Sequence, residues 1–91
     1  MTKEETLTRL LKTRDAVMRL PDEFEVAEVE VGGIHNARIH VRAVQDDALY
    51  RYANDNSLYC KTLVNEFDSY QGIHALDENG VEILQMVKRD V

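Results

Sequence analysis

Apolar side chains recur with helical spacing in the first twenty residues. The stripe consists of Leu7, Leu10, Leu11, Val17 and Met18, interrupted by Arg14. Side chains three, four and seven positions apart share one face of a helix, so the stripe predicts an amphipathic helix over residues 3–19. Thr2 and Glu5 match the capping box that begins helices, and Pro21 disfavours helix at the residue before it. We therefore expect a helix that begins after Thr2 and ends before Pro21.

The period changes to two at residues 24–31, where apolar residues alternate with glutamates. Such alternation is typical of a strand with one buried face. The alternation changes phase at Ala27, which predicts a β-bulge there or a strand that begins after it. Two glycines then open a loop over 32–36, and a second alternating run follows at 39–43. We expect the two runs to form an antiparallel hairpin.

Pairing Val31 with Ile39 makes both faces of this hairpin consistent. Valines then lie opposite apolar residues on the buried face, and acids lie opposite bases on the exposed face. The further cross-strand pairs expected are Val29 with Val41, Glu30 with His40, and Glu28 with Arg42. Opposite charges that face each other across two strands stabilise a sheet, so we expect the bases to neutralise much of the acidic strand.

Residues 46–67 hold one apolar phase that is typical of a helix. The phase is carried by Leu49, Tyr52, Ala53, Cys60, Leu63, Val64 and Phe67. Asp46 or Asp47 can cap the segment, and Gly72 is suited to follow its end. Residues 54–57 are poor helix formers. The pattern therefore allows either one long central helix or a pair of helices that break at 54–57.

The last part of the chain predicts a second hairpin. Residues 73–76 and 81–84 favour strands, and the intervening turn at 77–80 ends in Asn-Gly, a strong hairpin signal. The expected order is amphipathic helix, β-hairpin, central helix or helix pair, and C-terminal β-hairpin. We interpret residues 1–91 as a single small α+β domain.

Composition narrows the class of protein. The 91 residues are 44% hydrophobic and 31% charged, which is too apolar for a disordered chain and enough for one small core. No apolar run approaches the roughly 18–20 residues that span a bilayer, and the charged amino terminus does not match a secretory signal. The single Cys60 excludes an internal disulfide, so we expect a cytoplasmic protein with no membrane partner. The net charge of −6 argues against direct binding of nucleic acid.

No group of residues has the spacing of a catalytic or metal-binding motif. The histidines are His35, His40 and His74. Their spacing does not fit a zinc motif. Cys60 lies in an apolar phase without a nearby cation to stabilise a thiolate, and the acidic pairs at 46–47 and 77–78 fit helix capping and a turn. We expect no enzyme, no catalytic residues, no metal and no cofactor.

The acidic strand and one tyrosine suggest a contact surface. Residues 21–31 contain five acids and no base, and such a stripe can bind a basic partner or imitate a nucleic-acid backbone. Tyr50 beside Arg51 has the composition of a binding anchor. The candidate partner-binding residues are Glu25, Glu28, Glu30, Arg38, His40, Arg42, Tyr50 and Arg51.

The order of these segments resembles a known family. An amphipathic helix, an acidic strand, a Gly-Gly loop, the run Val41-Arg42-Ala43-Val44 and a helix starting at Gln45-Asp46-Asp47 resemble the amino-terminal part of bacteriophage tail assembly chaperones. The Asp-rich turn within residues 75–84 is similar too, and the resemblance covers about two thirds of the chain. It implies non-catalytic, transient binding of tape-measure and tail-tube proteins, and self-association. The family's usual carboxyl-terminal client-binding segment is expected to be missing or much reduced here.

Three functional hypotheses follow. The main hypothesis is a non-enzymatic protein-interaction module, related to phage tail assembly chaperones, that uses the first helix or the hairpin as its contact surface and can form homo-oligomers. The alternative is a small acidic inhibitor that blocks a host nucleic-acid-binding protein. Its phosphate mimics would be Asp22, Glu23, Glu25, Glu28 and Glu30. The third is a small enzyme whose acid–base residues are indistinguishable from turn acids.

Overall fold

The computed structural model describes residues 1–32, 35–64 and 69–89. They form two helices and five strands, and the α+β class is confirmed. In chain order the elements are α1 (Lys3–Arg19), β1 (Glu25–Gly32), β2 (His35–Arg42), α2 (Ala48–Asp55), β3 (Tyr59–Val64), β4 (Tyr70–Leu76) and β5 (Val81–Lys88).

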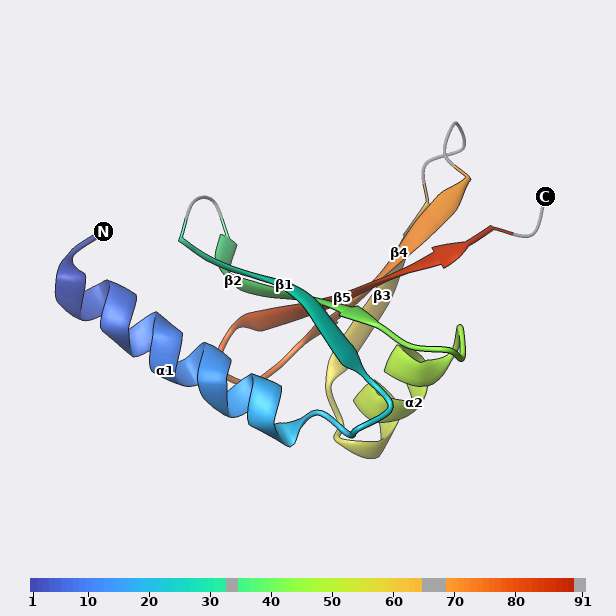
Figure 1. The fold of residues 1–91 in the computed structure, drawn as a ribbon, viewed down its shortest axis with the longest axis horizontal. Coiled ribbons are helices and arrows are strands. Elements are labelled where there is room, and N and C mark those ends of the chain that lie inside the picture. Colours follow the sequence, from blue (N-terminus) through green and yellow to red (C-terminus); the bar gives the residue numbers. More distant parts are fainter. Residues whose placement is uncertain (33–34, 65–68, 90–91) are drawn as a thin grey trace.

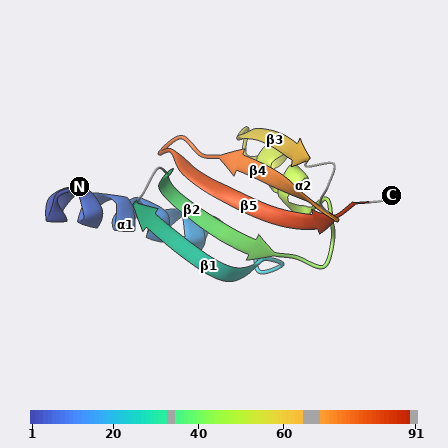
Figure 2. The same cartoon turned by 90° about the horizontal axis from the view of Figure 1, so that it is seen from above.

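The strands form one mixed sheet in the order β1-β2-β5-β4-β3. β2 and β5 pair in parallel, whereas the other neighbouring strands are antiparallel. Both helices lie on the same side of this twisted sheet (Figures 1 and 2). α1 lies against the β1–β2–β5 side and α2 against β3 and β4. Within the described residues, the opposite face of the sheet has no helix over it.

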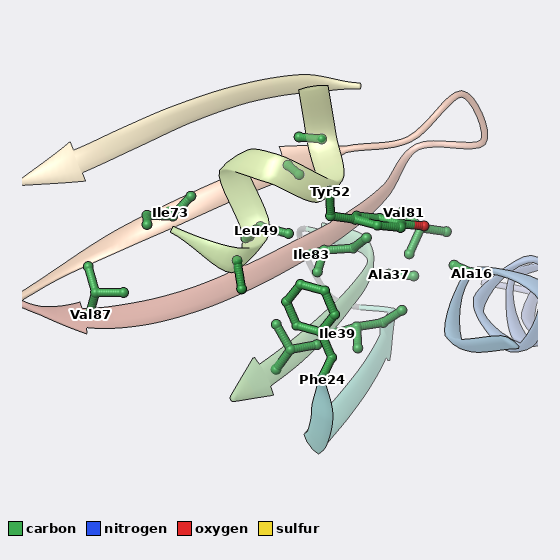
Figure 3. Close-up of a cluster of buried hydrophobic side chains, with 14 residues drawn as sticks. Ala16, Phe24, Ala37, Ile39, Leu49, Tyr52, Ile73, Val81, Ile83 and Val87 are labelled. Atoms are coloured by element: carbon green, nitrogen blue, oxygen red, sulfur yellow. The ribbon is translucent and has the colours of Figure 1, made fainter. Parts of the chain in front are cut away.

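The core lies between the sheet and the helices (Figure 3). Alternate residues of the three central strands point toward the helices. They are Ala37, Ile39 and Val41 of β2, Ile73 and Ala75 of β4, and Val81, Ile83 and Val87 of β5. Leu49 and Tyr52 of α2 pack against them, and the Tyr52 ring meets Phe24 edge to face at 5.8 Å between ring centroids.

One polar side chain lies inside this core. Gln85 of β5 is buried, and its Oε1 accepts a hydrogen bond of 3.1 Å from the Leu49 backbone N–H. Its Nε2 donates to the Gln45 backbone carbonyl at 3.0 Å. The amino-terminal end of α2 is therefore joined to the middle of the sheet by one amide. Asp47 occupies the N-cap position of α2 but makes no capping hydrogen bond; its carboxylate instead pairs with Arg51 at 3.3 Å.

The first helix has the predicted bounds and the predicted cap. The Thr2 hydroxyl accepts a hydrogen bond from the Glu5 backbone N–H and donates one to the Glu5 carboxylate, each at 3.1 Å. The residues that α1 buries are Thr13 and Ala16, not the leucines of its apolar stripe. The helix therefore contacts the sheet through a face with small side chains.

The first hairpin pairs two residues away from the expected register. Val31 lies opposite Ala37 instead of Ile39, and Val29 lies opposite Ile39. A shift of two residues keeps every side chain on the same face, so the alternation could not distinguish the two registers. The predicted bulge is confirmed, because the pairing shifts between Val26 and Glu28.

The expected central helix or helix pair over 46–67 is wrong in its second half. The helix ends at Asp55, and Ser57 has a positive φ of 54°, a backbone conformation that interrupts a helix. Residues 59–64 form the edge strand β3 instead. Gly72 lies inside β4 and does not end a helix. Residue 67, the last of the predicted apolar phase, lies outside the described residues.

Candidate interaction surface on the open face of the sheet

The sheet face that carries no helix is called the open face here. It consists of the side chains that alternate with the core residues along each strand. Neighbouring strands bring them into rows, which the pairing register defines. One row is Tyr59, Leu76, Glu82, Arg38 and Glu30, and the next is Lys61, His74, Leu84, His40 and Glu28. The open face therefore combines residues from all five strands.

The centre of the open face is an ionic cluster of Arg38, His74 and Glu82. Nε and Nη2 of Arg38 each donate to Glu82 Oε2 at 3.2 Å. Nδ1 of His74 is hydrogen-bonded to Glu82 Oε1. Since a carboxylate only accepts hydrogen bonds, Nδ1 carries the proton. The three side chains are largely buried, which strengthens these charge-assisted bonds.

The cluster sets the titration of Glu82. Burial by itself raises the pKa of this carboxyl, because desolvation disfavours the charged form. The hydrogen bonds from His74 and Arg38, together with the charges of these residues, outweigh burial and lower the pKa of Glu82 below its ordinary value. The folded protein therefore holds Glu82 ionised.

Gly72 leaves room for the histidine ring. A Cβ at this position would lie 2.9 Å from His74 Nε2 and 3.2 Å from Leu84 Cδ1. Any larger residue must displace the ring that Glu82 holds. The glycine thus belongs to the geometry of the ionic cluster, although it lies two residues from His74 along the strand.

Exposed apolar side chains of β3, β4 and β5 border the ionic cluster on one side and continue along the open face. This apolar rim consists of Tyr59, Leu63, Tyr70, Leu76 and Met86. Each is between 45% and 66% exposed. The register places Leu63, Gly72 and Met86 in one row, and Tyr59 beside Leu76 in another. A shallow hollow lies among Tyr59, Leu63, Leu76 and the ionic cluster. The rim and the cluster therefore form one continuous surface, with a hollow where they meet.

Six of the eight sequence-predicted contact residues lie on the open face. Each acid of β1 is opposite a base of β2, in the pairs Glu25–Arg42, Glu28–His40 and Glu30–Arg38. Tyr50 and Arg51 lie on α2, on the other side of the sheet, so the predicted set is divided between two surfaces. Arg51 pairs there with Asp47 and Glu23.

Of the three residues in the ionic cluster, the sequence pointed to Arg38 as a contact residue but not to His74 or Glu82. Arg38 lies 44 positions before Glu82 along the chain. Only the parallel pairing of β2 with β5 brings Arg38 beside Glu82. The apolar rim was hidden because Tyr59 and Leu63 were assigned to a helix face. Recognition of the β-favouring composition of residues 59–64 could have placed both on a strand.

The turn acids have structural partners. Oδ1 of Asp77 accepts hydrogen bonds of 2.9 Å from the backbone N–H groups of Asn79 and Val81, which closes the β4–β5 turn. Glu78 pairs with Arg19 at 3.8 Å. Burial raises the pKa of the Cys60 thiol, which disfavours the thiolate. In the described part of the chain, no three His, Cys, Asp or Glu side chains gather to hold a metal ion.

Neither α1 nor α2, the helices in the described ranges, is long and apolar enough to cross a membrane. Comparison of the chain with protein-family models, with curated proteins and with solved structures found no match.

Proposed function

We propose that this protein is a non-enzymatic protein-binding module and that the open face of its sheet is the contact surface. The observation that carries the proposal is the apolar rim on β3, β4 and β5 beside a largely buried ionic cluster. Exposed apolar groups gathered on one face and bordered by charged residues mark protein interaction sites. Tyrosine and arginine are the residue types that most often anchor such contacts, and both occur here in Tyr59, Tyr70 and Arg38.

The charge of the open face favours a partner with a mixed surface. Among the described strand residues, the acids Glu25, Glu28, Glu30 and Glu82 are balanced by Arg38, Arg42, Lys61 and Lys88. A face without net charge gains little from long-range attraction to a basic protein. The acidic-inhibitor hypothesis receives less support, because each of its β1 acids is opposite a base.

The first partner to test comes from the resemblance described above. A phage tape-measure or tail-tube protein is the proposed client, and it would bind through apolar segments that need shielding before assembly. Co-expression and co-purification with a tape-measure protein measures this directly. Failure of the chain to bind either tail protein would remove the chaperone assignment.

Matched substitutions test whether the open face makes the contact. Leu63→Asp and Leu76→Asp should each weaken client binding by more than tenfold, because each places a charge in the apolar rim. Val44→Asp is the control, since Val44 is 95% exposed and lies outside the strands. An equal loss of client binding in Val44→Asp and in the rim variants would contradict the proposal.

Salt and charge substitutions separate the two main hypotheses. Apolar contact should change little between low and high salt, whereas binding through acidic phosphate mimics should weaken steeply. The triple variant Glu25→Gln, Glu28→Gln and Glu30→Gln should retain binding if the rim is the contact. Its loss, together with steep salt dependence, would instead support the acidic inhibitor.

A further inference from the structure

The first helix exposes its most apolar side. Leu7, Leu11 and Met18 are 60%, 54% and 76% exposed, whereas Thr13 and Ala16 are each 3% exposed. Successive residues of a helix are about 100° apart, so Leu7 and the buried Ala16 lie on opposite sides of α1. Leu7, Leu11 and Met18 fall within an arc of about 40° and form a leucine stripe. This stripe faces away from the sheet.

The chain itself offers this stripe no partner in the described residues. The sheet lies on the opposite side of α1, and the amino-terminal turns of the helix extend beyond the ends of the strands (Figures 1 and 2). Hydrophobic packing usually stabilises a helix of this length more than its intrinsic propensity does. A helix that presents leucines outward therefore has an apolar surface available to another molecule.

The spacing along the stripe is that of a helix pair. Glu4, Leu7, Leu11, Arg14 and Met18 are separated by three, four, three and four residues. This is the repeat that places side chains along the seam between two packed helices. The two charged members of the seam have opposite signs and lie on either side of the two leucines. That arrangement distinguishes between possible orientations of a partner helix.

We propose that the leucine stripe of α1 binds the same stripe of a second copy of this chain, with the two helices antiparallel. In an antiparallel pair with a two-fold axis, Leu7 lies opposite Leu11 of the second copy. The same register places Glu4 opposite Arg14 of the second copy. The interface then contains two leucine layers flanked by two opposite-charge layers, and Leu10 lies beside the axis.

Charge favours the antiparallel over the parallel arrangement. Parallel helices in register would place Glu4 against Glu4 and Arg14 against Arg14, and like charges across a helix interface are destabilising. Arg14 now pairs with its neighbour Asp15 at 3.2 Å, an exposed contact that costs little to exchange. Both helices lie on the side of the sheet opposite the open face (Figure 1), and the stripe is on the exposed side of α1, so the dimer would leave both open faces accessible.

A charge-exchange experiment tests both the dimer and its orientation. Sedimentation of the full chain over a range of concentrations should show a monomer–dimer equilibrium in the micromolar range, since one helix pair is a small interface. Glu4→Arg and Arg14→Glu should each raise the dissociation constant by more than tenfold. The double variant Glu4→Arg with Arg14→Glu should restore it, because the opposite charges meet again.

Lys12→Glu is the matched control for Arg14→Glu. Lys12 is exposed on α1 away from the stripe, so the same change of charge should leave the dissociation constant within about twofold. Circular dichroism of each variant confirms that α1 is still formed. A wild-type chain that stays monomeric at every concentration, or a double variant that remains as weak as the single variants, would overturn the proposal.

Discussion

Single side chains join distant parts of this molecule. Gln85 links the start of α2 to β5, and Glu82 links β5 to β2 and β4 through Arg38 and His74. Both residues are on β5, but they point to opposite faces of the sheet. The last strand therefore has one polar connection into the core and one on the open face.

Replacement of Gln85 by leucine should destabilise the fold. The apolar side chain would leave the buried Leu49 backbone N–H without its partner. It would also remove one of the two hydrogen bonds that the Gln45 carbonyl accepts, the other being from the Ala48 backbone N–H at 3.2 Å. Leaving buried polar groups unsatisfied costs about 1–3 kcal/mol, which urea unfolding of the variant would measure. Gln45→Ala is the control, because only the backbone of Gln45 takes part and its side chain is exposed. A similar decrease in the free energy of unfolding in Gln85→Leu and Gln45→Ala would refute this role of Gln85.

Because of Glu82, the folded protein should lose stability as the pH falls into the acid range. Its folded-state pKa lies below the ordinary value of 4.5, so the unfolded chain binds a proton first as the pH falls. The stabilisation that the ionised Glu82 provides is complete above the pKa that this residue has in the unfolded chain. It is lost as the pH falls through the pKa of Glu82 in the folded protein. Urea unfolding between pH 7 and pH 3 should therefore show a steeper loss for the wild type than for Glu82→Gln. Parallel pH profiles of the two proteins would contradict this expectation.

The elements differ in how well the sequence determined them. The bounds of α1 were predicted correctly, because the capping residue, the apolar stripe and Pro21 all indicate the same helix. The segment from 46 to 64 was harder, since Leu49, Tyr52 and Cys60 fit a helical phase while residues 59–64 also suit a strand. Tertiary pairing with β4 decided in favour of the strand, and local pattern contains no information about that partner.

The amino-terminal turns of α1 should depend strongly on the capping residue. These turns gain little from packing, because Thr13 and Ala16 are the residues that the helix buries. Thr2→Ala should therefore cost about 0.5–2 kcal/mol in helix stability and increase fraying of the first turns. Amide hydrogen exchange at residues 5–8 would detect the change at protein concentrations below the dimer range. Unchanged exchange in that variant would show that the cap is not needed.

Across the whole molecule, the net charge of −6 is not distributed over one surface. The open face is balanced, and much of the acidity lies in turns and helix ends, as with Asp22, Asp47 and Glu78. The alternation of the two strands was enough to predict that the β1 acids face bases of β2. The actual partners differ from the expected ones, because the observed register differs by two residues.

The central position of β5 has a consequence for biosynthesis. Both neighbours of this strand, β2 and β4, are made before it, and it separates the β1–β2 pair from the β3–β4 pair. A nascent chain that lacks residues 81–88 has two separate ribbons, and such two-stranded units are marginally stable in water. The complete sheet can therefore form only after β5 has been synthesised. The edges of β2 and β4 that await β5 are then the surfaces on which a molecular chaperone, or an aggregating neighbour, would act.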